Sequence, residues 1–487
     1  ELILHPMVED AKEATGSMGD DTPVAVLSNH YRPISHYFRQ NFSQVTNPPI
    51  DSLRENKVMS LKTRFGNLGN ILDFENLTKE NIYVLDSPIL TNSQLKKFKT
   101  MFSKKIKVID CTFNTKDNLR NRIEEIRDEA EIAVRGGANH LILSDQNISE
   151  ERAIVPMILA VGASHSHLVK LSLRGYASIN VQTAEAMDTH SFAVLIGVGA
   201  TTVNPYLAID SIFQRYEKKL FGELDFASCV ERFKKSINAG LLKIMSKMGI
   251  SVLSSYRGGC NFEAVGLSRG LVADYFPGMI SRISGIGVSG IEKKIKELHF
   301  KTYQKNVVML PIGGLYKYRK SGEDHQFQGN LIHLLQSSVG RNSYEIFKKY
   351  TKGINDLNPT NLRDLLEFRK INKPLNINDV EPIEKITPRF GSGSMSHGAL
   401  SSEAHETLAI GMNRIKGSSC SGEGGEDEKR FKILKNGDSA NSKVKQVASA
   451  RFGVTIKYLN NCSEIEIKIA QGAKPGEGGQ LPGFKVT

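Results

Sequence analysis

A glycine-rich loop near the carboxyl end of the chain constrains the fold more than any other segment. Residues 471–483 hold five glycines and two prolines around one lysine, Lys474, and one glutamate, Glu477, directly after a strand pattern. Glycine lets the backbone adopt positive φ and approach a ligand closely, and proline stiffens a loop. A flexible linker is typically richer in serine and has no strand that delivers its charged groups to one place. The segment therefore predicts a binding loop at the carboxyl end of a strand.

The strand pattern before this loop has two different faces. Apolar and charged residues alternate along 464–470, so three isoleucines share one face while Glu466 and Lys468 share the other. On a half-exposed strand the charged face would meet water. In a β/α barrel the isoleucines would pack under the outer helices, and Lys468 would point into the barrel near its catalytic mouth. Alternation by itself does not choose between these two arrangements.

Two further glycine-rich loops, 391–401 and 417–427, flank an amphipathic helix. Ser401 is a suitable N-cap for this helix, Glu403 lies in its positive first turn, and four apolar side chains form one face. The stretch 446–453 follows, and then the strand and loop described above. This order is typical of consecutive β/α units and favours the barrel.

Four motifs stand in order from Arg389 to the last residue: RFGSGSMSHGALSSEAHETLAIGMNR, SGEGGEDEKRF, NGDSANSKVKQVASARFGVT and EIKIAQGAKPGEGGQLPG. They resemble the start of the FMN-binding synthase domain of the glutamate synthase large subunit. The first part of the chain is similar to the opening of that family's central domain, through PMVEDAKEATGSMGDDTPVAVLS and YFRQNFSQVTNPPIDSLRENKVMSL. The middle resembles the family more loosely, best in GVGATTVNPYLA and LLKIMSKMGISVLSSYRGG.

The resemblance implies an α/β fold in three parts. A parallel β/α central domain, 1–300, is followed by a connecting segment, 301–375, and by the first part of a (β/α)8 TIM-type barrel, 376–487. The apolar pattern of the first part agrees, because strands separated by helices of this length pair in parallel. It predicts strands at 106–109, 140–143, 192–196 and 250–253, and helices at 119–135, 154–161 and 230–248.

The resemblance also implies a reaction. Glutamate synthases convert 2-oxoglutarate and glutamine-derived ammonia into L-glutamate by hydride transfer from reduced FMN to 2-iminoglutarate. The electron donor is NADPH through a small subunit, or ferredoxin; the short 431–436 segment and the ending of the chain favour the bacterial NADPH type. The family's iron–sulfur cluster and its amide-hydrolysing cysteine lie outside this chain. The resemblance implies a cytoplasmic enzyme that is oligomeric when full length.

Flavin and substrate roles follow for residues of the matching motifs. Ser394, Met395 and Ser396 would edge the flavin ring with short side chains and backbone N–H groups, and Lys468 would favour negative charge on the reduced ring. Gln471 and Lys474 would bind the carboxylates and keto oxygen of 2-oxoglutarate, which makes Lys468 and Lys474 the catalytic pair. Arg451 would clamp flavin or substrate bidentately, or else pair with a barrel glutamate.

Three glutamates on glycine-flanked loops suit a different task. The resemblance implies that Glu423, Glu426 and Glu477 couple the loops to the amidotransferase site and line the ammonia tunnel. Solvated loop carboxylates are the alternative. Two positions depart from the family pattern: His397 replaces a bulky apolar residue and Ala450 replaces a glycine. Since the family holds the FMN phosphate with later strands, we expect the isolated chain to bind FMN poorly and to be inactive.

Composition limits the remaining function classes. The 487 residues are 40% hydrophobic with a net charge of +12, and the chain starts with Glu1, so we expect a piece of a longer soluble protein. The lysines are dispersed among glutamates, without an aromatic-interleaved basic cluster, which argues against nucleic-acid binding.

The five cysteines lack C-x-x-C spacing, so no metal site or redox dithiol is predicted. No apolar run reaches membrane-spanning length. Another FMN-dependent barrel oxidoreductase and a non-enzymatic basic module remain as alternatives.

Overall fold

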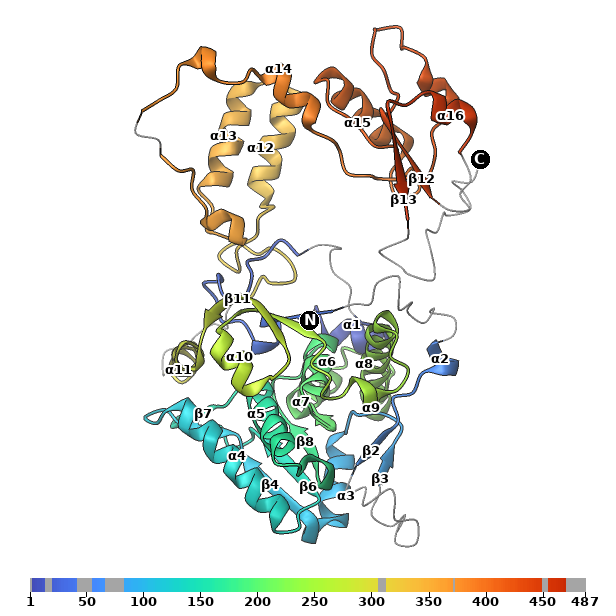
Figure 1. The fold of residues 1–487 in the computed structure, drawn as a ribbon. Helices are drawn as coiled ribbons and strands as arrows, with labels where there is room; N and C mark the ends of the chain where they lie inside the picture. Colours follow the sequence, from blue (N-terminus) through green and yellow to red (C-terminus); the bar gives the residue numbers. More distant parts are fainter. Residues whose placement is uncertain are drawn as a thin grey trace. The chain divides into compact units, whose positions relative to one another are not determined.

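The computed structural model describes residues 2–13, 20–41, 55–65, 83–304, 312–370, 373–448 and 454–469. The chain divides into two compact units between Glu367 and Phe368. Both units are of the α/β type (Figure 1). Among the described helices, none is both long and apolar enough to cross a bilayer.

The first unit is built on a four-stranded parallel sheet. Its strands are β4 (Ile106–Asp110), β6 (His140–Ser144), β8 (Ser178–Gln182) and β9 (Thr202–Asn204), adjacent in that order. Every residue of β6 and β8 is buried, as expected for a parallel sheet covered on both faces. Polar side chains within the sheet bond to one another: Nδ1 of His140 lies 2.8 Å from Oγ of Ser178.

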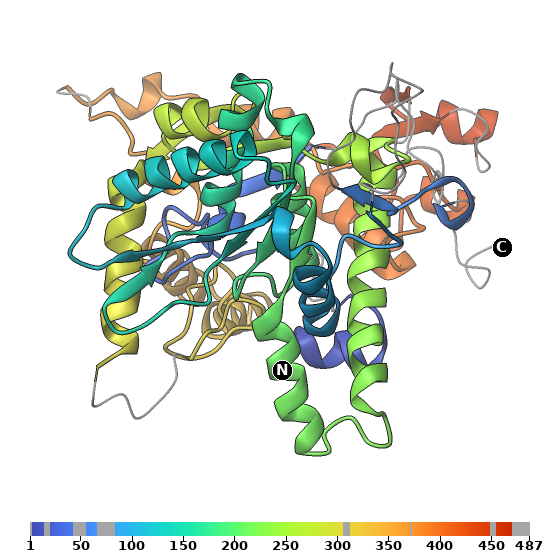
Figure 2. The same cartoon turned by 90° about the horizontal axis from the view of Figure 1, so that it is seen from below.

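Helices cover this sheet. α4 (Leu119–Arg135) and α5 (Met157–Lys170) lie side by side and pack against strands (Figures 1 and 2). Phe98 of α3 (Asn92–Met101) packs in a buried cluster with Ile142 of β6. α6 (Thr189–Gly197) and α7 (Tyr206–Glu217) pack on the long α8 (Phe226–Met248). Figure 2 shows α7 and α8 as neighbouring helices joined by a loop at one end.

Smaller elements complete the first unit. β10 (Phe262–Leu267) pairs in parallel with β11 (Ile280–Ile286) and antiparallel with β1 (Phe38–Gln40). Two antiparallel pairs are β2 (Thr63–Phe65) with β3 (Tyr83–Leu85), and β5 (Thr112–Asn114) with β7 (Arg152–Ile154). The other helices are α1 (Leu4–Glu9), α2 (Glu55–Val58), α9 (Leu253–Tyr256), α10 (Arg269–Tyr275), α11 (Val288–Thr302), α12 (Gly329–Gly340) and α13 (Tyr344–Asn355).

Some predictions for this unit are confirmed and two are wrong. The strands at 106–109 and 140–143 and the helices at 119–135 and 230–248 are present. The predicted strand at 192–196 is instead part of α6, because Asp188 and Ser191 form a capping box and the helix is buried on all sides. The predicted strand at 250–253 is reduced to one bridge, Ser60 with Val252, after which α9 begins. The helix expected from 154 begins at Met157, directly after Pro156.

The second unit contains the carboxyl-terminal β/α repeats. Its regular elements are α14 (Ile383–Ile386), α15 (Ser402–Arg414), β12 (Val444–Ala448), α16 (Ile456–Asn460) and β13 (Glu464–Lys468). Ser401 caps α15 as predicted, since its side chain accepts the N–H of Ala404 at 3.3 Å. β12 and β13 pair in parallel, with Gln446 opposite Glu466. Figure 1 shows α15 beside these two strands.

Candidate active site at the strand ends of the second unit

Four chain segments of the second unit pair in parallel and in sequence order. Gly391 bridges Ser418, Cys420 bridges Val444, and β12 continues the series to β13. Sequential parallel pairing is how a β/α barrel starts, and it places the carboxyl ends of all four segments at the same edge. The loops that follow these ends therefore emerge together. We call this edge the rim.

The first two glycine-rich loops touch at the rim. Gly422 has a φ of +63°, and a Cβ at this position would lie 2.5 Å from the backbone nitrogen of Ser396. A Cβ on Gly424 would lie 3.1 Å from the nitrogen of His397. Only glycine permits this backbone-to-backbone approach without displacing a loop. Ser396, a predicted flavin contact, is thus adjacent to the second loop.

A polar cluster joins all four segments. Oγ of Ser394 donates to Glu466 at 3.0 Å and lies 3.1 Å from Sγ of Cys420. The side-chain amide of Gln446 also donates to Glu466. Burial raises the pKa of the Cys420 thiol, so the group remains protonated near neutral pH. The carboxylate of Glu466 is accordingly the anionic centre of this cluster.

Lys468 provides a cation beside this carboxylate. It stands two residues beyond Glu466 on β13, so both side chains leave the same face of the strand. Nζ of Lys468 lies 3.1 Å from Glu423, and the two side chains retain 26% and 12% of their exposure. The rim thus presents two carboxylates, one ammonium group and a serine hydroxyl along one face of β13, partly open to solvent.

Two models of glutamate synthase regions match most of the chain. The glutamate synthase central domain matches residues 1–268, and the conserved region in glutamate synthase matches residues 325–487. The chain belongs to the glutamate synthase family. The resemblance in the sequence motifs is therefore confirmed.

Relatives of both electron-donor types are similar along the whole chain. The chain is 59% identical over its full length to the glutamate synthase (NADPH) large chain of Azospirillum brasilense, and 44% identical over 99% of its length to that of Bacillus subtilis. It is 42% identical over its full length to the ferredoxin-dependent glutamate synthase of Pyropia yezoensis. The chain spans about a third of the length of these relatives: 32%, 32% and 34%.

A solved structure overlaps less. The match to a mutant flavocytochrome b2 with pyruvate bound covers 45% of this chain and 46% of the flavocytochrome chain. Its TM-score is 0.24 and the sequence identity is 15%. That overlap is too small to bear on the fold, which rests on the strand order above.

The structure places the predicted glutamate synthase site residues unequally. Ser394, Ser396, Glu423 and Lys468 lie at the rim, and Met395 is beside them with 40% of its surface exposed. Glu426 is elsewhere: its side chain is fully buried and paired with Arg430 and Lys445, so it is not a solvated loop carboxylate. Gln471, Lys474, Arg451 and Glu477 lie outside the described residues.

Three rim residues were missed by sequence reasoning. Glu466 shares the alternating face of Lys468, and that signal was sufficient to find it. Gln446 and Cys420 gave no such signal, because their place at the rim depends on how neighbouring strands align in register. The isoleucine face also differs from expectation. Ile465, Ile467 and Ile469 are 50%, 77% and 94% exposed, so this face of β13 is not packed under a helix.

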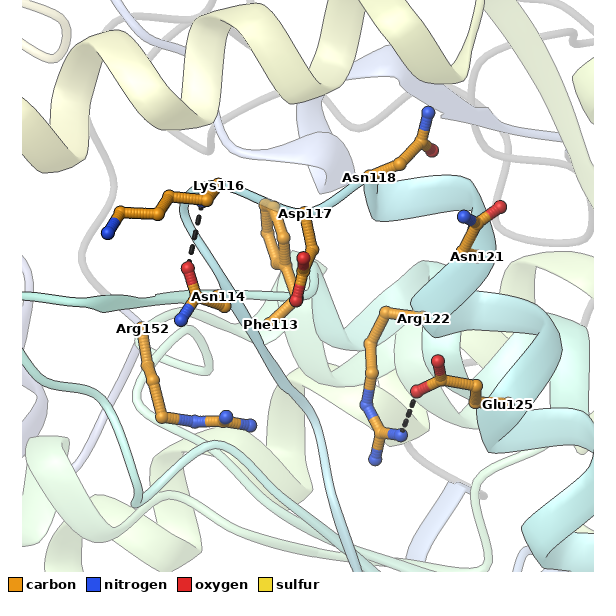
Figure 3. Close-up of a pocket in the computed structure, with 9 residues that line it drawn as sticks. All are labelled: Phe113, Asn114, Lys116, Asp117, Asn118, Asn121, Arg122, Glu125 and Arg152. Carbon is orange, nitrogen blue, oxygen red and sulfur yellow. Dashed lines mark hydrogen bonds and ion pairs between the residues drawn. The ribbon is translucent and has the colours of Figure 1, made fainter.

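The first unit has a polar pocket of about 620 Å³ beside the start of α4 (Figure 3). Its two arginines are already paired: Arg122 contacts Glu125 and Glu129 at 2.7 and 2.9 Å, and Arg152 contacts Asp110 at 3.0 Å. The rim of the second unit is therefore the stronger candidate for chemistry. The pocket is lined by Phe113, Asn114, Lys116, Asp117, Asn118, Asn121, Arg122, Glu125 and Arg152.

Proposed function

We propose that this chain is part of an FMN-dependent glutamate synthase that forms L-glutamate from 2-oxoglutarate and ammonia released from glutamine. The observation that carries the proposal is the convergence of Ser394, Glu423, Glu466 and Lys468 at the carboxyl ends of successive parallel strands. That edge is where β/α barrels place their active sites. The similar proteins named glutamate synthase support the same conclusion.

The rim residues fit a flavin ring. The pyrimidine edge of isoalloxazine presents both donors and acceptors, and a nearby cation favours the reduced, anionic ring. Lys468 supplies the cation, and the hydroxyls of Ser394 and Ser396 supply short hydrogen-bonding groups. When bound, FMN would supply the hydride. The protein's own part is to hold the ring, exclude water and orient the substrate.

The substrate and ammonia roles extend this proposal. Gln471 and Lys474 bind the 2-oxoglutarate carboxylates and keto oxygen, with Lys474 completing the catalytic pair, and Arg451 clamps flavin or substrate. Glu423 and Glu477 line the path of ammonia to the rim. The contact between Lys468 and Glu423 supports the latter role, since an entering ammonia molecule would meet a carboxylate next to the flavin-facing cation.

The intact enzyme would have further partners. We propose NADPH as the donor, through a small subunit, because the relatives named for NADPH reach 59% and 44% identity while the ferredoxin-dependent relative reaches 42%. An iron–sulfur cluster would carry the electrons, with ligands outside this chain. We place the oligomeric assembly in the cytoplasm.

Replacement of Lys468 tests the proposal in the intact enzyme. Lys468→Met should lower kcat for glutamate formation by about 100-fold, or roughly 3 kcal/mol of transition-state stabilisation. Lys457→Met is the matched control, because Lys457 lies in the same unit but pairs with Glu428 where both side chains are more than half exposed. It should change kcat by less than about twofold. Equal activity of the two variants, or no glutamate from the wild-type enzyme, would refute the function.

A further inference from the structure

A buried ionic cluster lies behind the rim, on the other face of β12. Glu426, Arg430 and Lys445 form it, and we call it the brace. One carboxylate oxygen of Glu426 lies 3.0 Å from Arg430, and the other contacts Nζ of Lys445. The exposed fractions of these side chains are 0%, 5% and 0%. Two cations thus share one anion away from water.

Every group of the brace has additional partners. Nζ of Lys445 donates to Asn441 at 2.6 Å and stands over the rings of Phe431 and Tyr458 at 4.8 and 5.1 Å. Arg430 donates twice to the carbonyl of Ala440, at 3.0 and 2.8 Å. The Glu426 oxygen that faces Arg430 also accepts the N–H of Ser442, at 3.3 Å. The cluster is therefore a fixed structure with defined geometry.

Such a cluster is a poor source of stability. The cost of removing ions from water offsets most of their attraction, so apolar side chains of the same volume often stabilise a fold as well or better. Burial lowers the pKa of Lys445 despite the neighbouring Glu426, which shows how unfavourable the site is for a charge. What the brace does provide is a single allowed position for each chain segment that contributes to it.

One of those segments carries Glu423. The loop 421–427 is fixed at one end by Ser421, whose N–H donates to the carbonyl of Val444 at 3.0 Å and whose hydroxyl lies 2.6 Å from that of Tyr458. Glu426 fixes the other end. Glu423 stands between these anchors and meets Lys468 at the rim. Both anchors lead back to β12 or to the helix that precedes β13.

β12 links the two sides directly. Lys445 and Gln446 are consecutive strand residues, so their side chains leave opposite faces. Gln446 donates to Glu466 at the rim, whereas Lys445 binds Glu426 in the brace. A shift of the brace would consequently move the loop that holds Glu423 relative to the strand that holds the rim cluster.

We propose that Glu426 and Lys445 are positioning residues that hold Glu423 against Lys468, and that they act on the reaction through Glu423. This inference rests on the proposed function of the rim, and it assigns Glu426 a role in the site without contact with ammonia or substrate.

A double-mutant cycle in the intact enzyme tests the inference. Glu426→Gln should lower kcat for glutamate formation by about 30-fold, because the amide cannot hold both cations. Glu423→Gln removes the group through which Glu426 acts. In that background Glu426→Gln should lower kcat by less than about threefold, since residues that act through one another are non-additive. Additive effects of the two substitutions would overturn the proposal.

Asp438→Asn is the matched control for this cycle. It breaks the ion pair of Asp438 with Arg414, whose charged atoms are 2.7 Å apart. This pair lies in the same unit, but the side chain of Arg414 is 66% exposed. The substitution should change kcat by less than about twofold in either background. If Glu426→Gln does not fold, Lys445→Gln replaces it in the cycle, with the same expected non-additivity.

A second measurement does not depend on turnover. In a crystal structure of Glu426→Gln, we expect the contact of 3.1 Å between Glu423 and Lys468 to be lost. An unmoved contact would overturn the positioning role even if kcat falls. If the wild type forms glutamate and Glu426→Gln has the same kcat, only the positioning role of the brace is refuted. If the wild type forms no glutamate, the proposed function itself is refuted.

Discussion

The two units end their parallel sheets in different ways. In the first unit, hydrogen bonds between neighbouring loops seal the carboxyl ends of β6 and β8: Asp145 accepts the hydroxyl of Thr183 at 2.6 Å and the N–H of Ala184 at 3.0 Å, and Glu185 accepts the N–H of Met157 at 2.7 Å. In the second unit, the carboxyl groups of Glu466 and Glu423 bond to side chains from other loops and strands and remain partly exposed.

This difference indicates how one architecture serves two purposes. A buried carboxyl group whose oxygens are taken by the neighbouring loop, as for Asp145 at 1% exposure, fixes that loop and has little capacity left for a ligand. A carboxylate that stays accessible to water, as at the rim, can exchange its side-chain partners for ligand contacts when a substrate arrives. We therefore expect substitutions in the second unit to affect turnover, and those in the first unit to affect folding.

The largest effect on turnover should come from the close approach of the loops at the rim. Gly422→Ala places a Cβ 2.5 Å from the backbone of Ser396 and should separate the two loops, lowering kcat by about 100-fold. Gly437→Ala is the control. Gly437 also has positive φ, +87°, but nothing lies within 4 Å of its Cβ position, so the backbone strain is similar without the clash. Steady-state kinetics of both variants in the intact enzyme would separate the two causes, and equal losses would contradict our account of the rim.

The corresponding substitution in the first unit should change stability only. A Cβ on Gly162 in α5 would lie 2.3 Å from the buried ring of Phe276, so Gly162→Ala should lower the free energy of unfolding by about 2 kcal/mol. Gly270→Ala in α10 meets nothing within 4 Å and should be neutral or slightly stabilising. Denaturant unfolding measures both. A changed kcat per folded molecule for Gly162→Ala would show that the first unit is coupled to the chemistry.

The sealed edge should also be visible in the pH dependence of stability. Burial raises the pKa of Glu185 from 4.5 to about 7, so the folded state favours the protonated carboxyl. This contribution is complete below pH 4.5 and is lost as the pH rises towards 7. Over that interval the wild type should lose about 3 kcal/mol relative to Glu185→Gln, which does not titrate there. Unfolding free energies at several pH values test this, and parallel profiles would show that the carboxyl is not buried in the folded protein.

Sequence periodicity predicted the elements that have one buried side and one exposed side. α4 has polar and apolar sides and ends at a glycine pair, and its predicted bounds match the structure. α6 is buried on all sides, so its run of apolar residues carries no helical period and wrongly predicts a strand. Only its capping box, Asp188 with Ser191, distinguished the two possibilities.

The candidate site was predictable where it depends on one segment. The alternation of β13 indicated which way Lys468 points, and the glycines marked the loops that meet. The contacts between segments were not predictable, because they depend on strand register and on backbone approach: Gln446 with Glu466, and Gly422 with Ser396. The burial of Glu426 is of the same kind, since its partner Lys445 lies on a neighbouring strand.

The smallest expected effect on turnover comes from Ser394, and it tests whether the rim is open to water, unlike the sealed sheet edge of the first unit. Ser394→Ala removes one hydroxyl from Glu466 but leaves the donor of Gln446 in place. In a sealed edge an unsatisfied buried oxygen would reduce stability. At the partly exposed rim water replaces the lost donor, so the free energy of unfolding should change by less than about 0.5 kcal/mol.

The reaction should still be affected, because a water molecule is less well placed than a fixed hydroxyl: we expect kcat/KM for 2-oxoglutarate to fall about fivefold, or roughly 1 kcal/mol. Ser394→Thr keeps the hydroxyl and should recover most of the loss. A large loss of stability with unchanged kinetics would mean that the rim is sealed like the edge of the first unit.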